Sequence, residues 1–575
     1  MNLLTSALCS LCLSMPLLQD APPPPVAPPA QTVATAIAKL QAQDFAGAAA
    51  DFAVVVAREP NNGQAWFLYG FSEHALGNLE RALELHTKAA TFPAHQPVAC
   101  YNAACATARL GRIDTAFEWL AQSRAAGYVN FQAMSVDGDL VELRKDPRFA
   151  DYRVEPPNSK RPFLENVTIL HDSFGERAGA QYGWVARAIG DADGDGVSDF
   201  ASTAPYHTEN GQATGYVAVI SGKTGKRLHR LIGKPGSMFG WSVAPAGDVD
   251  LDGFADLVVG APGPAQGRFK GEAVVVSGKS GATLHTWTGA AASDRFGQDA
   301  RGVGDVNGDG IPDLLVSAPQ HDTAGPDAGR VYLISGKDGA HLHHFDGEKV
   351  GDNLGGGGVC GVWNERQQLL VASGVAAGAT NQGRIYGWGG PTFESRFVID
   401  GIPSSRNLGW FLSIVPDANG DGLDDVYGTD WHDNKGGPAA GRAFVSSGKD
   451  GSLLAEFLGQ PGDGAGIGVG HAGDLDGDGV HDFVVGAWLN GDCGTQAGKV
   501  TCYSGKTGAV LGTLTSRIPG DVLGFDADGI GDADGDGVPD LLVTSAYNAA
   551  QGAKAGRTYV VSGASVLKPR TESGD

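Results

Sequence analysis

The sequence is short of positive charge. Its 42 lysine and arginine residues stand against 65 aspartate and glutamate residues, which gives a formal net charge of −23. Nucleic acids and anionic membrane surfaces are bound mainly through lysine and arginine, so neither is an expected partner. Hydrophobic residues still make up 42% of the chain, which is enough for a core, and global disorder is not expected. This charge balance fits a protein that collects cations.

Long apolar runs are also missing. No uninterrupted run reaches the roughly 20 residues that a membrane helix needs, so we expect no membrane span. Residues 1–20 are apolar, and residues 21–30 are rich in proline. We interpret them as an export signal and a Pro-rich linker, although the usual basic start of a signal is absent. The protein is then extracellular, cell-surface or periplasmic; the alternative is a disordered or buried N-terminal segment.

Cysteines and catalytic motifs are scarce. Among the 7 cysteines, Cys493 and Cys502 flank an expected hairpin, either as a disulfide or as two ordinary small residues. There is no G-x-S-x-G elbow and no H-E-x-x-H helix motif. The GKT and GKS fragments lack the upstream glycine of a phosphate-binding loop, so we interpret SGKTG as a turn between strands. The sequence therefore predicts a protein that is not an enzyme.

The front of the chain, residues 31–150, has a helical period. Ala48, Ala82 and Ala116 occupy the same place in three similar segments, 34 residues apart. This spacing resembles that of tetratricopeptide repeats, which are built from paired helices. Such an array presents a groove for a protein partner, or it serves only as a helical spacer. Residues 151–162 are expected to form a linker.

A second repeat begins near residue 163. Acidic loops such as DADGDGVSD start at residues 191, 248, 305, 417, 474 and 532, mostly 57 residues apart. The one double step predicts a seventh unit near residue 361, where the chain reads GVWNERQQLLVASG and has no acidic loop. The array therefore has seven units and six intact loops.

Each unit also carries an FG-like pair before the loop, an apolar run ending near GAP after it, and an SGKTG-like turn. Together these features resemble the FG-GAP repeats of the integrin alpha-subunit β-propeller, over residues 163–567. The resemblance implies seven four-stranded blades, so the fold class is a helical domain followed by a seven-bladed β-propeller, with a tail at 568–575. The last unit lacks its outer strand. Residues 167–175 match the missing piece, so we expect them to close the ring.

The aspartates need a cation, because crowded carboxylates repel one another. Calcium prefers six to eight oxygen ligands, which a D-x-D-x-D-x-x-x-D loop can supply. The expected ligands in each loop are four side chains and, at the seventh position, a backbone carbonyl: Asp191, Asp193, Asp195, Val197 and Asp199; Asp248, Asp250, Asp252, Phe254 and Asp256; Asp305, Asn307, Asp309, Ile311 and Asp313; Asp417, Asn419, Asp421, Leu423 and Asp425; Asp474, Asp476, Asp478, Val480 and Asp482; Asp532, Asp534, Asp536, Val538 and Asp540.

These loops are not EF-hands, because Ser202 stands where an EF-hand needs its bidentate glutamate. About six Ca²⁺ ions are expected, one per loop. Their main role is to make the hairpins rigid.

The variable loops lie on the opposite face of such a propeller, and by resemblance that face binds partners. Exposed aromatic residues and one base are the candidate ligand contacts: Tyr206, Arg268, Phe269, Trp431, Trp488 and Tyr547. The first hypothesis is an exported, calcium-binding protein for interaction or adhesion, with a protein or glycan ligand. The alternatives are a propeller enzyme that acts on polysaccharide at the axial mouth, and a purely structural envelope protein.

Overall fold

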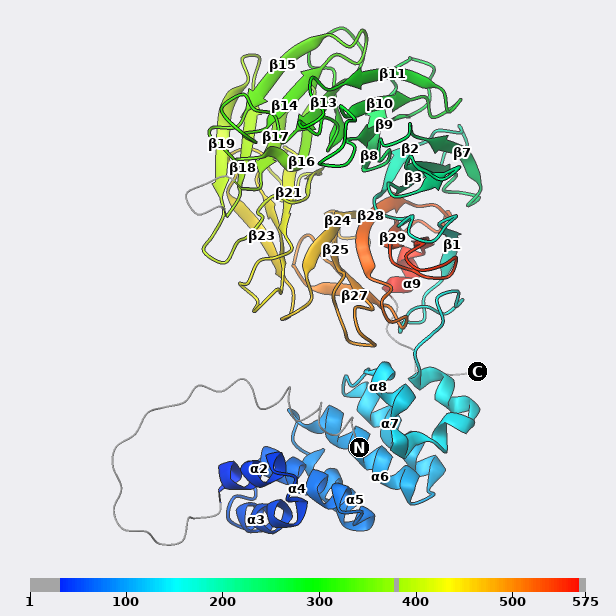
Figure 1. Cartoon of the computed structure of the whole chain (residues 1–575), viewed down its shortest axis with the longest axis vertical. Helices are drawn as coiled ribbons and strands as arrows, with labels where there is room; N and C mark the ends of the chain where they lie inside the picture. Colours follow the sequence, from blue (N-terminus) through cyan, green and yellow to red (C-terminus); the bar gives the residue numbers. More distant parts are fainter. Residues whose placement is uncertain (1–31, 377–381, 568–575) are drawn as a thin grey trace, which may run out of the picture. The chain divides into compact units, whose positions relative to one another are not determined.

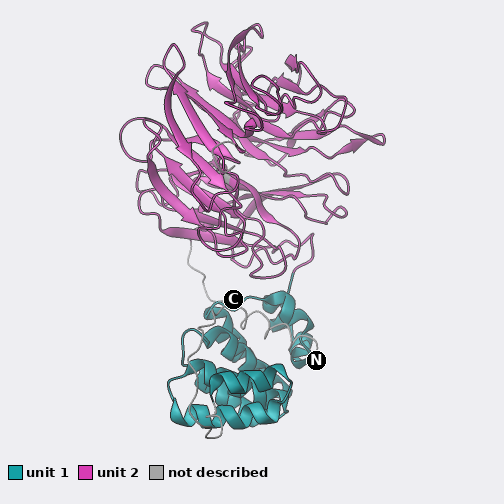
Figure 2. Ribbon diagram, turned by 60° about the vertical axis from the view of Figure 1, so that its left-hand side comes forward, with its two compact units in different colours: residues 1–154 teal, residues 155–575 magenta. Residues whose placement is uncertain are grey.

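The computed structural model describes residues 32–376 and 382–567. The expected export signal (1–20), Pro-rich linker (21–30) and tail (568–575) lie outside these residues. The chain divides into two compact units, Met1–Val154 and Glu155–Asp575 (Figure 2). No helix in the described ranges is long and apolar enough to cross a membrane.

The first unit consists of helical hairpins. Its helices are α2 (Val33–Gln41), α3 (Phe45–Arg58), α4 (Gly63–Ala75), α5 (Leu79–Ala89), α6 (Gln96–Arg109), α7 (Ile113–Ala125) and α8 (Phe131–Val136), followed by the 3₁₀ turns η1 (Gly138–Leu140), η2 (Leu143–Lys145) and η3 (Pro147–Tyr152). Helices α3, α5 and α7 begin at residues 45, 79 and 113, which repeats the 34-residue period. Ala48, Ala82 and Ala116 are each 0% exposed, as expected for small residues where helices pack closely.

The second unit is a β-propeller, in which the described residues form seven four-stranded antiparallel sheets (Figure 1). We number the blades 1 to 7 in chain order. Their strands are β2 (Ala186–Gly190), β3 (Asp199–Ala204), β6 (Tyr216–Ile220) and β7 (Arg227–Ile232); β8 (Ser242–Gly247), β9 (Asp256–Ala261), β10 (Glu272–Val276) and β11 (Thr283–Thr288); β12 (Ala300–Gly304), β13 (Asp313–Ala318), β14 (Arg330–Ile334) and β15 (His341–Asp346); β16 (Leu354–Trp363), β17 (Gln368–Gly374), β18 (Arg384–Gly389) and β19 (Glu394–Asp400); β20 (Leu412–Val415), β21 (Asp425–Asp430), β22 (Arg442–Ser446) and β23 (Leu453–Leu458); β24 (Ala465–Gly473), β25 (Asp482–Ala487), β26 (Lys499–Tyr503) and β27 (Val510–Thr515); β28 (Leu523–Gly531), β29 (Asp540–Ser545), β30 (Arg557–Val561) and β1 (Ile169–Phe174). A small hairpin, β4 (Thr208–Glu209) and β5 (Gln212–Ala213), and a short helix, α9 (Gly563–Val566), complete the unit.

The first strand of each blade lines the propeller axis, because the first strands of neighbouring blades contact one another around the ring. The second strands, such as β9 with the sequence DLVVGA, are buried along their whole length, apart from the half-buried Gln368 at the start of β17. Their β-branched and leucine side chains fill hydrophobic clusters shared by neighbouring blades. The core of the propeller therefore lies between the blades, and each blade depends on its neighbours.

The ring closes as the sequence predicts. Strand β1, which precedes blade 1 in the chain, pairs antiparallel with β30 and forms the outer strand of blade 7. Tyr182 adds a backbone hydrogen bond of 2.9 Å from its N–H to the carbonyl of Ala555. This pairing of β1 with β30, which we call the clasp, covers the sheet edge that blade 7 would otherwise expose.

A second tie runs from residue 155 to residue 165, largely within the segment expected to be a linker. The N–H of Arg517 donates to the carbonyl of Pro162 at 2.7 Å, and the N–H of Leu164 donates to Thr515 at 2.8 Å. Arg557, which is 0% exposed, donates to the carbonyl of Ser159 at 3.0 Å. This strap holds blades 6 and 7 together from the outside.

Candidate functional site

The six acidic loops join the first and second strands of their blades. In blade 1, Asp191 Oδ1 accepts hydrogen bonds from the N–H groups of Gly194 at 2.6 Å and Asp195 at 3.2 Å. Gly194 and Gly196 have φ angles of 81° and 84°, a region that favours glycine and lets the chain wrap around its own carboxylates. The backbone thus holds the loop carboxylates in place.

The closing aspartate of the loop is buried and fixed by backbone hydrogen bonds. Asp199 is 0% exposed and begins strand β3. Its Oδ2 accepts from the N–H of Ala192 at 2.8 Å, and its Oδ1 accepts from the N–H of Gly222 at 3.0 Å. Burial raises the pKa of Asp199 to about 6, so the charged form gains from a nearby cation.

The same geometry recurs in the other loops. The closing aspartates are all 0% exposed, and burial raises the pKa of each: Asp199, Asp256, Asp313, Asp425, Asp482 and Asp540. In four loops, three carboxylates each place an oxygen within 4.8 Å of the others: Asp191, Asp193 and Asp199; Asp248, Asp250 and Asp252; Asp474, Asp476 and Asp482; Asp532, Asp534 and Asp540. Oxygens in this arrangement suit a hard divalent cation.

The other two loops carry asparagine at the third position. Asn307 Oδ1 accepts from the N–H of Asp309 at 2.9 Å, and Asn419 Oδ1 accepts from Asp421 at 2.8 Å. Asp193 accepts from Asp195 in the same way at 3.2 Å in blade 1. The asparagines therefore keep the ligand position and remove one negative charge.

The SGKTG-like turns lie beside the acidic loops, as strands that alternate in direction require. Lys279 Nζ is 3.6 Å from Asp252 Oδ2, and Lys506 Nζ is 3.8 Å from Asp478 Oδ2. These turns connect the third and fourth strands of their blades, as the sequence predicts. Their lysines offset part of the charge of the acidic loops.

The opposite face of the propeller carries a connected series of aromatic rings. Neighbouring ring centroids lie between 5.0 and 6.3 Å apart along a path through blades 5, 6, 7, 1 and 2. We call this series the aromatic arc: Trp410, Trp431, Trp488, Phe525, Trp184 and Trp241, flanked by Tyr206 and Tyr547. The indole N–H groups of Trp431 and Trp488 are buried without a hydrogen-bond partner in the described structure. Arg295 lies 5.2 Å from the ring centroid of Trp241.

Four of the six candidate ligand contacts lie in the arc or beside it: Trp431 and Trp488 are members, and Tyr206 and Tyr547 flank it. The other two, Arg268 and Phe269, lie in the loop between β9 and β10. Arg268 is exposed, and Phe269 packs against the core cluster of blades 1 and 2. Sequence reasoning missed Trp184, Trp241, Trp410 and Phe525. Each directly follows the glycine of an FG-like pair, and this recurrence was the signal that could have identified them.

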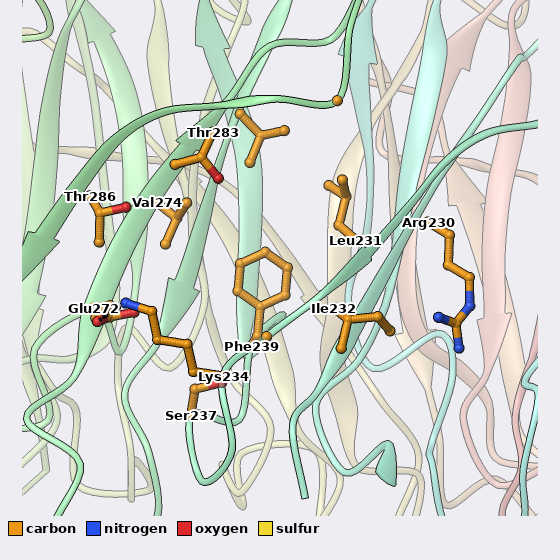
Figure 3. A pocket seen from close by; sticks show the side chains of 13 residues that line it. Arg230, Leu231, Ile232, Lys234, Ser237, Phe239, Glu272, Val274, Thr283 and Thr286 are labelled. Carbon is orange, nitrogen blue, oxygen red and sulfur yellow. Dashed lines mark hydrogen bonds and ion pairs between the residues drawn. The ribbon is translucent and has the colours of Figure 1, made fainter. Parts of the chain in front are cut away.

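A separate cavity of about 290 Å³ lies between blades 1 and 2, at their outer strands (Figure 3). Phe239, Leu231 and Val274 form apolar walls, and Glu272 lies among them with only 8% of its surface exposed. Lys234 covers this carboxylate, with Nζ 2.6 Å from Glu272 Oε1 (Figure 3). Because the one buried charge already has a partner, the cavity points to no particular ligand.

The helical unit also brings ligating atoms together. Cys105, Asp137 and Asp139 each place one such atom within 4.8 Å of the others. However, Tyr101 donates a hydrogen bond to Asp137, and His74 Nε2 lies 2.9 Å from Asp139 Oδ2. Protein groups therefore satisfy these carboxylates, and the cluster ties η1 to α4 and α6.

Comparisons with known proteins agree with this architecture. A family model described as FG-GAP repeat matches residues 239–276 and 302–334. The chain is 36% identical to human integrin alpha-7 over 152 residues, which are 25% of this chain and 13% of that protein. It is 29% identical to mouse integrin alpha-E over 199 residues, which are 32% of this chain and 16% of that protein. The chain thus carries FG-GAP repeats in a seven-bladed propeller, and it covers only a small part of the length of these relatives.

Proposed function

We propose that this protein is an exported, calcium-binding, non-enzymatic interaction or adhesion protein. The observation that carries the proposal is the contrast between the two faces of the propeller. One face holds six preorganised carboxylate loops, and the other holds the aromatic arc. The relatives are integrin alpha subunits, which supports a non-enzymatic role and a place outside the cell.

Six Ca²⁺ ions, one in each acidic loop, are the metal content of this proposal. The donors are oxygens only, which favours Ca²⁺ over metals that prefer sulfur or nitrogen. The ligand set is the four side chains and the one carbonyl of each loop, as the sequence predicts. In this proposal the ions stabilise the hairpins and keep the scaffold rigid, while the arc contacts the partner.

The partner is a protein or a glycan that stacks on the arc. Half-buried tryptophan and tyrosine rings offer a large contact area at little cost in conformational entropy. Arg295 adds a positive group at one end of the arc. The helical hairpins provide a second surface for a protein partner in this proposal.

The enzyme alternative is less well supported. Among the described residues on the axis, Asp299 and Asp526 accept backbone hydrogen bonds from the neighbouring blade, from Val359 and Ala186, and so join blades. Asp528 and His471 also lie there, but they form no recognised catalytic arrangement. The structural-envelope alternative has no specific observation in its favour, because it leaves the aromatic arc unexplained.

The experiment is a binding screen of the full chain on glycan and extracellular-protein arrays in calcium. A Trp241→Ala, Trp431→Ala double variant should lose at least about ten-fold in affinity for any ligand found, since such aromatic contacts dominate binding energy. The matched control is Leu251→Ser, because Leu251 is 64% exposed and lies in an acidic loop on the other face. A ligand bound equally by the double variant, or lost with Leu251→Ser, would contradict the assignment of the face.

A further inference from the structure

A polar cavity lies on the propeller axis. Its volume is about 460 Å³, and the first strand of every blade contributes to its wall: Arg187, Ala244, Arg301, Cys360, Ser413, His471 and Asp528. Ser198 and Gly531 also line it, and they belong to the acidic-loop end of their blades. The cavity is thus distinct from the aromatic arc, which lies at the other end of the axis.

Two buried carboxylates next to this cavity are already satisfied. Asp526 is 2% exposed and accepts from the N–H groups of Ala186 at 2.9 Å and Ala527 at 3.0 Å. Asp299, which is 5% exposed, accepts from the N–H of Val359 at 3.0 Å in the same way. Because backbone N–H groups already donate to both carboxylates, neither carboxylate requires every N–H group of its arginine partner.

The two arginines in the wall are only partly used. Arg187, with 9% of its side chain exposed, bonds through Nη1 alone, to Asp526 and to the carbonyl of Ala186. Arg301 bonds through Nε alone, to Asp299 at 3.4 Å. The remaining guanidinium N–H groups have no protein partner in the described residues, although both side chains line the cavity. These N–H groups are accessible from the cavity, because neither arginine has a fully buried polar atom without a partner in the described residues, so they are available to an acceptor there.

The other described residues of the cavity wall do not supply an acceptor for these arginine N–H groups. Asp528 accepts one hydrogen bond, from its neighbour Gly529 at 3.1 Å, and burial raises its pKa to about 6. His471 Nδ1 is buried without a hydrogen-bond partner in the described structure. Pro245, Ile414 and Ile530 form apolar parts of the wall. The cavity therefore offers two guanidinium groups, the carboxylate of Asp528, an imidazole and apolar surface together.

We propose that the axial cavity binds a small organic acid, whose carboxylate is held by the free N–H groups of Arg187 and Arg301. A planar carboxylate matches the fork of a guanidinium group and can accept two parallel hydrogen bonds. The volume leaves room for an organic body against the apolar wall and the polar groups. This site goes beyond the proposed function, since it requires neither the aromatic arc nor metal in the loops.

The experiment is calorimetric titration of the full chain, in calcium, with glucuronate and with glucose. The two sugars have similar rings, and only glucuronate carries a carboxylate. Glucuronate should bind at one site per chain and glucose should not. Equal heats from both sugars, or no heat from glucuronate and from a second probe, succinate, would overturn the proposal. Inorganic phosphate is a third probe, and binding as tight as that of both carboxylates would overturn the preference for a planar group.

Variants of the cavity wall distinguish a loss of binding from a loss of folding. Arg301→Gln should weaken glucuronate binding by at least about ten-fold, because it removes one fork. Asp528→Asn should strengthen binding, because it removes a nearby negative charge. Arg366→Gln is the matched control, since Arg366 is exposed at a turn of blade 4 and lies outside the cavity wall. Unchanged affinity in Arg301→Gln, with its melting temperature unchanged, would also overturn the proposal.

Discussion

Blade 4 makes the same first hairpin as the other blades without an acidic loop. Its turn, residues 364–367, closes through Asn364 Oδ1, which accepts from the N–H groups of Arg366 at 2.9 Å and Gln367 at 2.8 Å. Gln367 is 3% exposed and reaches blade 5, where Oε1 accepts from the N–H of Asp424 at 2.6 Å and Nε2 donates to its carbonyl at 2.8 Å.

In blade 1 the acidic loop performs a similar joining role with its backbone, since the N–H of Ala255 in blade 2 donates to the carbonyl of Asp191 at 3.1 Å. A neutral side chain can therefore join two blades as well as an acidic loop can. Hairpin formation therefore does not explain the aspartates in the other six blades, and their arrangement fits the proposed cation binding.

The largest expected effect follows from removing calcium. At a calcium concentration of about 100 times Kd, each occupied site stabilises the fold by about 2.7 kcal/mol, so six sites together dominate the stability of the ring. Chelation should lower the melting temperature sharply. Hydrogen exchange should accelerate in all six acidic loops and least in residues 364–367. Equal acceleration of hydrogen exchange in residues 364–367 would contradict the difference drawn between blade 4 and the six blades with acidic loops.

A smaller effect is expected from the closing aspartate of one loop. Asp199→Ala leaves the N–H groups of Ala192 and Gly222 without an acceptor, which should cost about 3 kcal/mol even in chelator. Asp193→Ala is the matched control, because Asp193 is exposed and accepts only from Asp195. It should weaken calcium binding at one loop but leave the melting temperature in chelator nearly unchanged. Equal losses of stability in chelator for the two variants would contradict the structural role assigned to Asp199 alone.

Gln367→Ala should cost about 1–2 kcal/mol, because it removes both hydrogen bonds to Asp424. Unlike the aspartate variants, it should cost the same with calcium and with chelator, as measured by thermal unfolding in each. A cost that appears only in calcium would mean that blade 4 depends on the metal of blade 5.

The smallest effect concerns the loops with asparagine. Asn307→Asp restores the charge found in blade 1 and should tighten calcium binding at that loop by about five-fold, through added Coulomb attraction. Calcium titration followed at this loop by NMR would measure the change, with Asn419→Asp as its counterpart in blade 5. Weaker binding would indicate that repulsion between carboxylates outweighs the added attraction.

The repeat array could be predicted almost completely, because each blade carries its own local signals. The 57-residue period predicted the blade count and the blade without an acidic loop, and the match of residues 167–175 to the missing outer strand predicted the closing strand β1. The aromatic arc was predicted only in part, since its neighbouring rings come from different blades and Phe525 meets Trp184 only when the propeller ring closes. The axial cavity could not be predicted, because Arg187 and Asp526 are 339 residues apart and no local pattern links them.

The clasp in blade 7 sets a waiting time during synthesis. Asp172 of β1 and its partner Arg557 are 385 residues apart, so β1 leaves the ribosome long before its sheet exists. At about 5–20 residues per second, the wait is roughly 20–80 seconds. During that interval β1 and the strap of residues 155–165 are unpaired, and a second nascent chain offers them the same partners. Closure of one chain on itself therefore competes with exchange of β1 between neighbouring chains. The outcome depends on which β1 strand pairs first with β30 of blade 7, the last blade to be synthesised.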